Sequence, residues 1–578
     1  MKLRRISLVF PALLLGGLSL AGCSNDEEVR VLRILNAEDY IYEFNEEEDL
    51  DYAIELSDEE KASMSEAEIA EFELRYGNNY RMNMVKQFEE YWEKTHNEKI
   101  EVVYDTFDTN ETMFNELNTG KTTYDVIVPS DYMIQKLRTK GLLEPFDNDF
   151  IEEVYENIPD FLKNKFSNVI VDKSSGTDAY YSVPYMWGTV GVMYNPEYYD
   201  EYYGYEEDEV HKLFSDWDSL YGEELQGTFS IKDSVRDTYA VSLIHRYRDE
   251  ISKLGDDAES QKELAKIFNM YDEATMAEVK KDMISLKENS FGFETDSGKT
   301  DMTTMKIGAN MCWSGDATWA ITQAEEFGRE IYYSIPTSYN DQELKGASNI
   351  WFDGFCMPKS NDLHKDLAQG FIEFMSQPEN AAQNCYCIGY TPAIAGDEML
   401  EYILGEYSAE ATLDYYKGCL DGLDEKYDDL IAEAKNKKQI VKLEEEREAE
   451  RESLQESIKA EEEWIKSNKD TTDNYYDLRY FYGNDVDEAY FLPCLGSVGR
   501  QLTAQYPSEE VIPRLAIMEN FSDEGTIRLL DMWEQVRTNA LPLWGIIVLS
   551  IEAAAALGFG IYLIMRKTHR KKDKKARI

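Results

Sequence analysis

The chain has 578 residues, with 59 Lys and Arg against 114 Asp and Glu, and a formal net charge of -55. At roughly 150 residues per domain, this length predicts two to four domains. A hydrophobic content of 43% supports a large core and excludes a chain that is disordered throughout. The negative charge excludes a nucleic-acid binder, because phosphate contacts need a basic face. Such acidity is compatible with a cationic ligand, and equally with solubility alone.

The first residues resemble a bacterial lipoprotein signal. A basic start with Lys2, Arg4 and Arg5 precedes an apolar run at 6–20 and a Leu-Ala-Gly-Cys sequence that ends at Cys23. Small residues before the cysteine fit a signal peptidase site, and the thiol can accept a diacylglycerol. We therefore expect residues 1–23 to be a signal peptide with a lipobox, with lipid attachment at Cys23. An ordinary signal peptide or a short anchor is the alternative.

The carboxyl-terminal part contains a second membrane signal. Residues 541–565 are apolar except for Glu552, and residues 566–578 carry eight Lys and Arg against one Asp. At ~1.5 Å per residue, the apolar segment is long enough to cross a hydrocarbon core of ~30 Å with some tilt. Positive charges favour the cytoplasmic side. We expect a transmembrane helix at 541–565, a cytoplasmic tail at 566–578, and the main body on the extracytoplasmic face of the cell membrane.

Between these ends, strand patterns alternate with helical patterns, in the order that predicts a parallel sheet in an α/β fold. Ligands bind such sheets at the carboxyl ends of the strands. The first elements predicted are a strand at 29–35, an acidic surface insertion at 45–75, helices at 81–95 and 110–117, and strands at 99–104 and 124–129. Later elements are a helix at 147–162, strands at 180–184, 190–194, 227–231, 309–313 and 349–357, and helices opening at Asp233 and Ser314.

Residues 407–470 interrupt this alternation. Two apolar stripes at helical spacing lie on either side of Asn436, and runs of mixed charge cover the remaining positions. This pattern predicts an inserted helical hairpin. It is either a solvated decoration or a docking arm for a partner. The α/β pattern resumes near Asp477 and ends by Thr538.

The seven cysteines and five histidines do not indicate a disulfide framework or a metal site. Cys385 and Cys387 would point to opposite faces of an extended strand, so we expect no bridge between them. No metal-ligand spacing is present among the histidines. We expect no metal and no cofactor.

Aromatic and acidic residues recur together at the ends of the predicted strands. An ammonium ion is bound by such a set, since each aromatic face attracts a cation by ~0.5–2 kcal/mol and a hydrogen bond to a charged group contributes ~1.5–3 kcal/mol. Any single pair is more often a core residue or a helix cap. The argument for a cation site therefore rests on recurrence. The pairs are Asp39 with Tyr40, Ser130 with Tyr132, Asp233 with Asp237, Trp313 with Asp316, and Trp351 with Asp353, and Tyr390 adds a further ring.

Several ordered motifs resemble the bacterial spermidine/putrescine-binding proteins, the substrate-binding components of polyamine ABC importers. The resemblance covers about residues 29–400 and 477–538. It implies a two-lobed periplasmic-binding-protein type II fold that closes on its ligand by a hinge motion. The motifs are Ile34-Leu-Asn-Ala-Glu-Asp-Tyr40, Thr109-Asn-Glu-Thr-Met-Phe114, Tyr124-Asp-Val-Ile-Val-Pro-Ser-Asp-Tyr132, Val183-Pro-Tyr-Met-Trp-Gly188, Trp351-Phe-Asp353 and Ile388-Gly-Tyr-Thr-Pro392. The expected division is a first lobe at 29–143 plus 353–401, a second lobe at 144–352 plus 471–538, and a hairpin at 407–470.

The resemblance also implies a set of ligand-binding residues. Three carboxylates would bind ammonium groups, and the aromatic side chains would enclose the alkyl chain. One departure is Ala37, where the family often has a Trp, so one aromatic wall is missing and the ligand length is in question. The expected site residues are Asp39, Tyr40, Ser130, Tyr132, Asp237, Trp313, Trp351, Asp353, Tyr390 and Glu519.

The function implied is capture of spermidine or putrescine outside the cell and delivery to ABC permease subunits that work with a separate cytoplasmic ATPase. No covalent chemistry is expected. A glycosidase with paired carboxylates is disfavoured, because no acid/base pair stands apart from these motifs and no G-x-S-x-G nucleophile motif appears. Binding of thiamine or another organic cation, of ferric ion or of a sugar remains an alternative, as does a polyamine-sensing surface receptor.

Overall fold

The structure is a computed structural model that describes residues 29–42, 83–120, 123–174, 178–295, 297–325, 327–337, 346–360, 362–434 and 436–538. Cys23, the whole acidic insertion predicted at 45–75, and the apolar segment at 541–565 lie outside the described residues. Within the described ranges, no helix is both long and apolar enough to cross a membrane.

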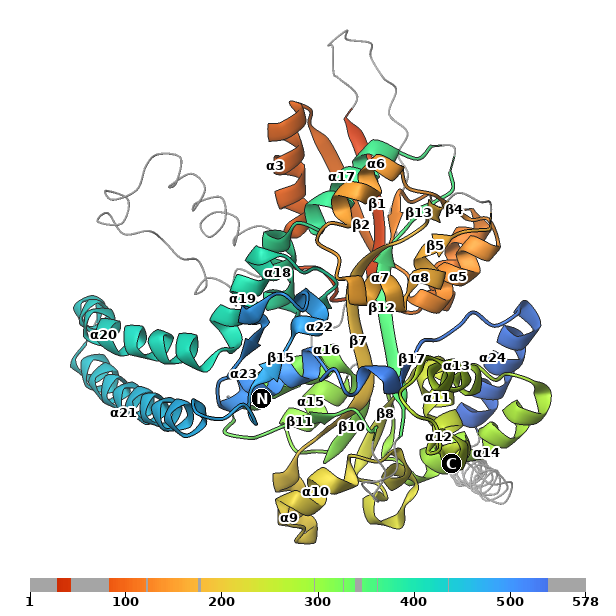
Figure 1. Ribbon diagram of the computed structural model, residues 1–578. Coiled ribbons are helices and arrows are strands. Elements are labelled where there is room, and N and C mark those ends of the chain that lie inside the picture. The colour runs from red at the N-terminus through yellow and green to blue at the C-terminus, as the bar shows by residue number, and fades with distance from the viewer. Residues whose placement is uncertain are drawn as a thin grey trace, which may run out of the picture.

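The first lobe is built on a parallel three-stranded sheet with the order β2-β1-β3. Its strands form where the sequence has short apolar runs, and helices cover the sheet (Figure 1). Asn83 and Thr109 start the first two helices by accepting backbone N–H bonds, as capping residues do. The elements are β1 (Arg30–Ala37), α3 (Met84–His96), β2 (Ile100–Phe107), α4 (Asn110–Thr119), β3 (Val126–Ile127), α5 (Asp131–Thr139), β4 (Leu143–Glu144), α6 (Asn148–Val154), α7 (Asp160–Lys165), α8 (Ser167–Ile170), β5 (Val171–Asp172) and β6 (Ala179–Tyr180).

Two long strands lead from the first lobe to the second. β7 (Val183–Tyr194) is buried along its whole length, and it pairs antiparallel with β12 (Ser348–Phe355). The first half of β7 belongs to the apolar core of the first lobe, and the second half belongs to the core of the second lobe. In Figure 1 the pair runs vertically between the lobes. These strands are therefore the structural connection about which the lobes could move.

The second lobe surrounds a larger mixed sheet with the order β17-β12-β7-β10-β8-β9. Strands β8, β9 and β10 run parallel to one another, so their carboxyl ends meet at one edge. The elements are α9 (Pro196–Tyr203), α10 (Glu207–Leu213), η4 (Trp217–Tyr221), η5 (Glu223–Leu225), β8 (Phe229–Lys232), α11 (Val235–Arg246), α12 (Arg248–Ile251), α13 (Ala258–Phe268), α14 (Glu273–Asn289), β9 (Gly292–Glu294), α15 (Ser297–Thr303), β10 (Ala309–Trp313), α16 (Ser314–Glu325) and β11 (Tyr332–Ser334).

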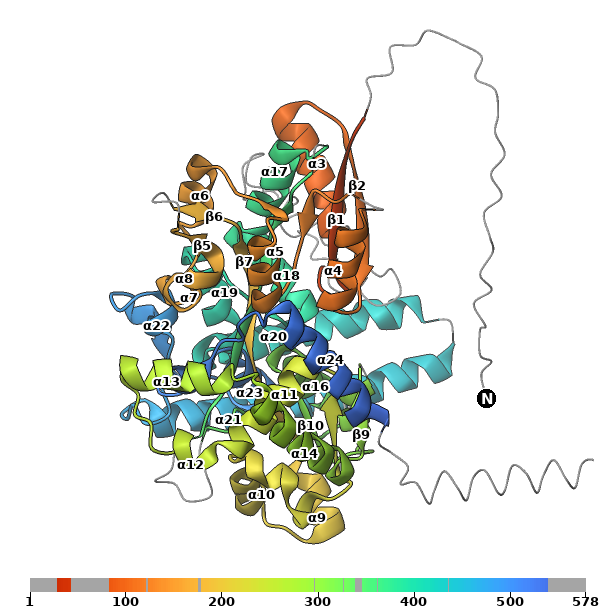
Figure 2. The same ribbon diagram turned by 90° about the vertical axis from the view of Figure 1, so that its right-hand side faces the viewer.

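After β12 the chain returns to the first lobe, and later segments add to both lobes. The final helix, α24, packs against α11 and α14 of the second lobe (Figure 2). The elements are β13 (Met357–Pro358), α17 (Lys365–Met375), α18 (Pro378–Ile388), β14 (Thr391–Pro392), α19 (Asp397–Tyr407), α20 (Ala409–Glu433), α21 (Lys437–Asn468), β15 (Tyr476–Asp477), α22 (Arg479–Tyr482), η6 (Asp487–Ala489), β16 (Tyr490–Phe491), α23 (Gly496–Gln505), η7 (Ile512–Arg514), β17 (Leu515–Ala516) and α24 (Asp523–Thr538).

Helices α20 and α21 form the predicted hairpin, which projects from the body in Figure 1. Asn436 starts α21 by accepting a hydrogen bond from the Gln439 N–H. Salt bridges such as Arg451 to Asp424 at 2.6 Å join the two helices along their exposed faces. At the base, Trp464 donates its indole N–H to the Pro493 carbonyl oxygen at 2.9 Å and holds the hairpin to the body.

The structure differs from the expected lobe boundaries and from some expected elements. Residues 144–187 were expected in the second lobe, yet their apolar side chains pack into the core of the first lobe, as do those of residues 478–506. The sequence spacing identifies strands but not the core that they join. The end of the strand expected at 180–184 and the strand expected at 190–194 are both part of β7, while Tyr180 belongs to the separate strand β6. Cys385 and Cys387 lie on helix α18, which starts at Pro378, and not on an extended strand.

Candidate ligand-binding site

The carboxylate of Asp353 lies where β12 changes its register against β7, between Asp353 and Gly354. Such a bulge turns a side chain out of the regular alternation of a strand. Asp353 also forms an isolated bridge with Ser130, and the Gly354 N–H donates to the Pro129 carbonyl oxygen at 3.1 Å. These backbone contacts hold β12 against the residues that precede α5, at the position of Asp353.

Tyr40 follows β1 and connects Asp353 to the aromatic residues. Its hydroxyl donates to Asp353 Oδ2 at 2.7 Å. Its ring meets the Tyr390 ring edge-on, with centroids 4.9 Å apart, and the Tyr185 ring at 5.5 Å. The Tyr185 hydroxyl donates to the Tyr40 carbonyl oxygen at 2.5 Å. Tyr40 is therefore held at both its backbone and its ring.

Two further aromatic side chains lie directly on glycine backbones. Trp351 is 8% exposed and contacts Gly188, where an added Cβ would come within 2.7 Å of the indole. Tyr390 lies on Gly315, where an added Cβ would come within 2.5 Å of the phenol ring. Larger residues at these two positions would displace the rings, so glycine permits the close approach. The centroids of the Trp351 and Tyr390 rings are 6.2 Å apart.

The second lobe supplies its residues from the carboxyl ends of β8 and β10 and from the helices that follow. The Trp313 indole N–H donates to Asp237 Oδ2 at 3.1 Å. Asp237 lies in the first turn of α11, which Ser234 caps. In the first turn of α16, Asp316 accepts a hydrogen bond from the Tyr390 hydroxyl at 3.2 Å. The Trp313–Asp237 bond lies within the second lobe, and the Tyr390–Asp316 bond joins that lobe to the boundary with the first.

We call this set of residues the junction cluster, because its members come from the first lobe, the connecting strand and the second lobe. Tyr390 packs against the apolar cores of both lobes, so it lies at their boundary. The cluster surrounds three acids with aromatic rings, which is an arrangement suited to an organic cation. Its members are Tyr40, Asp237, Trp313, Asp316, Trp351, Asp353 and Tyr390.

Burial makes the carboxylates at this junction unusually easy to protonate. Burial raises the pKa of Asp353 to about 6, although hydrogen bonds from Ser130 and Tyr40 oppose the shift. Burial also raises the pKa of Asp237, against the lowering effect of Ser234 and Trp313. The negative charge of Asp237 adds to the shift at Asp353. An arriving cation would stabilise the ionised forms of both acids.

Asp131 is a third buried acid beside these two. Burial raises its pKa well above the ordinary value, a hydrogen bond from the Tyr132 N–H opposes the shift, and the charge of Asp353 adds to it. Within the described part of the chain, its Oδ2 has no hydrogen-bond partner. A buried carboxylate oxygen without a partner is costly, so it is a candidate to receive an ammonium N–H.

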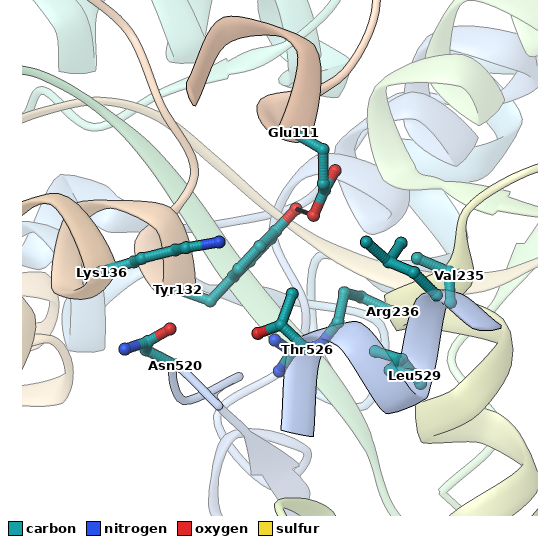
Figure 3. Close-up of a pocket in the computed structure, with 9 residues that line it drawn as sticks. Glu111, Tyr132, Lys136, Val235, Arg236, Asn520, Thr526 and Leu529 are labelled. Atoms are coloured by element: carbon teal, nitrogen blue, oxygen red, sulfur yellow. Dashed lines mark hydrogen bonds between the residues drawn. The ribbon is translucent and has the colours of Figure 1, made fainter. Parts of the chain in front are cut away.

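Tyr132 connects the junction to a narrow cavity of about 10 Å³ between the lobes. In Figure 3 its ring lies beside Arg236, and its hydroxyl meets Glu111. The hydroxyl donates to Glu111 Oε1 at 3.2 Å, and the Arg236 guanidinium lies 4.7 Å from the ring centroid. Arg236 also donates to the Glu519 carbonyl oxygen at 2.8 Å. This cavity therefore borders the junction on the side of α24.

The structure brings together most of the expected site residues. Ser130 borders the cluster, where its hydroxyl accepts from Asn110 Nδ2 at 2.9 Å. Asp39 is exposed in a turn with a φ of 52°, and it makes none of the contacts described above. Glu519 is also exposed, and its contact with Arg236 involves only its backbone oxygen. The structure therefore does not place either of these two carboxylates in the junction cluster.

The cluster and its immediate surroundings include three residues that the expected set omitted. Asp131 looked like a helix-starting residue, and nothing in its local sequence distinguishes that role from ligand binding. Asp316 follows Trp313 in the first turn of a helix, which was a usable signal. Lys232 closes a strand and contacts Asp316, but no local pattern predicts a pair that is separated by 84 positions.

Comparison with known proteins identifies the family. The family model described as bacterial extracellular solute-binding protein matches residues 83–397. The chain belongs to this family. The expected α/β binding-protein fold is thereby confirmed, and the family is one of solute-binding proteins.

Its relatives in sequence include two proteins of Escherichia coli (strain K12). The spermidine/putrescine-binding periplasmic protein is 27% identical over 305 residues, which cover 52% of this chain and 73% of that protein. The putrescine-binding periplasmic protein PotF is 28% identical over 290 residues, which cover 49% and 68%. In three dimensions, a putative spermidine/putrescine ABC transporter from Listeria monocytogenes matches with a TM-score of 0.51 at 19% identity, over 88% of this chain and 99% of that one. This last likeness supports the fold alone.

Proposed function

We propose that this member of the family captures a polyamine at the junction cluster and delivers it to the permease of an ABC importer. The observation that carries the proposal is the meeting of the buried acids Asp131 and Asp237 with the half-buried Asp353 beside a frame of aromatic rings. Relatives in sequence are named as spermidine- and putrescine-binding proteins, which agrees with this chemistry.

The energies of the contacts are sufficient for useful affinity. Hydrogen bonds to charged ammonium groups contribute ~1.5–3 kcal/mol each, and aromatic faces contribute ~0.5–2 kcal/mol each. Several of each reach the ~8 kcal/mol of a micromolar complex after the costs of association. Alkyl segments between the ammonium groups would pack on Tyr40, Trp351 and Tyr390.

The mechanism is binding with closure, as in type II periplasmic binding proteins. Ligand ammonium groups would replace water at the buried acids and hold the lobes together, and the paired strands β7 and β12 would act as the hinge. The loaded protein would then present the polyamine to permease subunits that work with a separate ATPase. Lipid at Cys23, the segment at 541–565, or both would keep it on the extracytoplasmic face of the membrane.

Calorimetric titration of the full chain, purified in mild detergent, tests this function. Putrescine, spermidine, thiamine and a neutral sugar are compared at neutral pH. Micromolar or tighter binding of a polyamine, without binding of the sugar, supports the proposal. Binding of thiamine alone would assign the site to another organic cation, and binding of none of the four would refute polyamine capture.

A further inference from the structure

A lysine of this chain already occupies one cation position at the junction. Lys232 ends β8, and its ammonium nitrogen lies 2.8 Å from Asp316 Oδ2 and 4.7 Å from the centroid of the Trp313 ring. Its side chain is 7% exposed. An acid on one side and an aromatic face on the other are the contacts that a polyamine ammonium would make.

Both neighbours of Lys232 belong to the junction cluster. Asp316 accepts from Tyr390 as well as from Lys232, and Trp313 donates to Asp237 while its face receives the ammonium. The lysine therefore lies beside the aromatic frame and is not in a separate structural pair. It comes from the carboxyl end of a strand that runs parallel to its neighbours, at the sheet edge where ligands bind.

The charge of Lys232 is held firmly. Burial lowers its pKa, but the carboxylates of Asp316 and Glu294 raise it by more, and the net shift is upward. Glu294 lies opposite Lys232 in the neighbouring strand, 4.0 Å from the ammonium nitrogen. Glu294 also accepts from the Gly298 N–H at 2.9 Å and from Asn310 at 3.1 Å. Because two acids already surround Lys232, it is not available to bind an anionic ligand group.

Lys232 pairs directly with Asp316, whereas Asp131, Asp237 and Asp353 form no salt bridge with a lysine in the described structure. The nearby charges of Arg236 and Lys232 only partly offset the rise that burial causes in the pKa of Asp237. We propose that Lys232 takes the place of one ligand ammonium, so that the site selects a diamine over a triamine. This inference rests on the proposed function and specifies its substrate class. A third ammonium on a longer ligand would meet the charge of Lys232 in place of a free carboxylate.

The test compares affinities for putrescine and spermidine in the full chain and in Lys232→Met. The wild type should bind putrescine more tightly than spermidine. Lys232→Met frees Asp316, so the ratio of the two dissociation constants should move toward spermidine by at least about tenfold. An unchanged ratio in a folded variant that still binds putrescine would overturn the inference and leave polyamine capture standing. A wild type that prefers spermidine would overturn it too. A wild type that binds neither amine would refute the proposed function itself.

Two further variants separate charge from space. Lys232→Met/Asp316→Asn removes both members of the pair and should keep the preference for putrescine. A shift toward spermidine in this double variant would mean that added room is responsible, which would overturn the charge argument. Lys306→Met is the matched control, since Lys306 also pairs with an acid, Asp301 at 2.9 Å, and lies near a ring, but is 53% exposed outside the cluster. Its ratio should not change.

Loss of Lys232 leaves two buried acids without their cation, and the variant could unfold as a result. In that event Lys232→Met is refolded with each amine, and the recovery of its near-ultraviolet circular dichroism is measured. Rescue by spermidine at concentrations where putrescine has no effect supports the inference. Equal rescue by both amines, or by neither, overturns it.

Discussion

Replacing Asp353 with asparagine should change affinity and stability in opposite directions. Asn keeps the shape and can still accept from Tyr40, but it removes the negative charge. The ligand loses a hydrogen bond to an ionised group, worth ~1.5–3 kcal/mol, which weakens polyamine binding by at least about tenfold. The ligand-free variant no longer buries a charged carboxylate, so its free energy of unfolding rises.

The stability effect follows from the pKa of the same group. Burial raises the pKa of Asp353 from 3.8 to about 6, which corresponds to roughly 3 kcal/mol at ~1.4 kcal/mol per pH unit. Because the carboxyl is partly accessible to water, we expect the free energy of unfolding of Asp353→Asn to exceed that of the wild type by only ~1–2 kcal/mol. With a raised pKa, the favourable contribution is complete at low pH and is lost as pH rises through about 6. The gain in the variant should therefore be largest near pH ~8 and vanish only near pH ~3.5, below the ordinary pKa of 3.8.

Thermal unfolding of the empty protein at both pH values and calorimetric titration provide the assay. Asp216→Asn is the matched control, because the Asp216 side chain is fully buried in the second lobe and paired with Arg248 at 3.4 Å. The control should lose stability and keep its affinity. Unchanged polyamine affinity in Asp353→Asn would remove this acid from the site. A lower unfolding temperature near pH ~8 would refute the argument from burial.

Other predictions concern the same junction and its surroundings. Wild-type affinity should fall as pH drops below about 6, because protonated Asp353 no longer attracts an ammonium, and Asp353→Asn should flatten that dependence in titrations across the same range. Trp351→Phe should weaken polyamine binding several-fold while the protein stays folded, whereas unchanged binding would exclude Trp351 from the ligand contacts. Lys140→Met breaks an exposed pair with Asp523, with side chains 33% and 68% exposed, so chemical denaturation should show almost no loss of stability; a clear loss would show that this pair holds the lobes together. Replacing the hairpin tip at 428–446 with a short linker should leave the binding heats unchanged, since the tip lies outside the cluster.

Local sequence patterns predicted those elements well whose position depends only on a short apolar run or on a capping residue. The strand that becomes β1, the strand that becomes β10 and the helix that begins at Ser314 all appear where the apolar runs and polar caps indicated. The hairpin around Asn436 follows from two helical stripes and a capping residue. In each case the signal and the structure involve neighbouring residues only.

Long-range contacts account for what the sequence did not show. β7 continues through Gly188 because Trp351 packs on that glycine, and only the folded sheet reveals this contact. Similarly, residues 144–187 pack into the core of the first lobe because the first half of β7 lies in that core, and the local sequence does not show this. Tyr40, Trp351 and Asp353 were found through motifs, but the pairing that makes them a site joins positions 313 residues apart.

Two features of this chain reduce what the junction can hold, and they act on opposite lobes. Ala37 ends β1 in the first lobe, where the resemblance to the polyamine-binding proteins leads us to expect a tryptophan, so one expected aromatic face is absent there. In the second lobe, Lys232 covers a face of Trp313 and neutralises Asp316. A polyamine would thus lack one aromatic contact in the first lobe and one free carboxylate in the second. Both losses should weaken the binding of a long triamine more than the binding of a short diamine. If Ala37→Trp raised the affinity for spermidine only when combined with Lys232→Met, the two ends would be acting on one ligand. Independent effects of the two substitutions would mean that they contact different parts of it or different ligands.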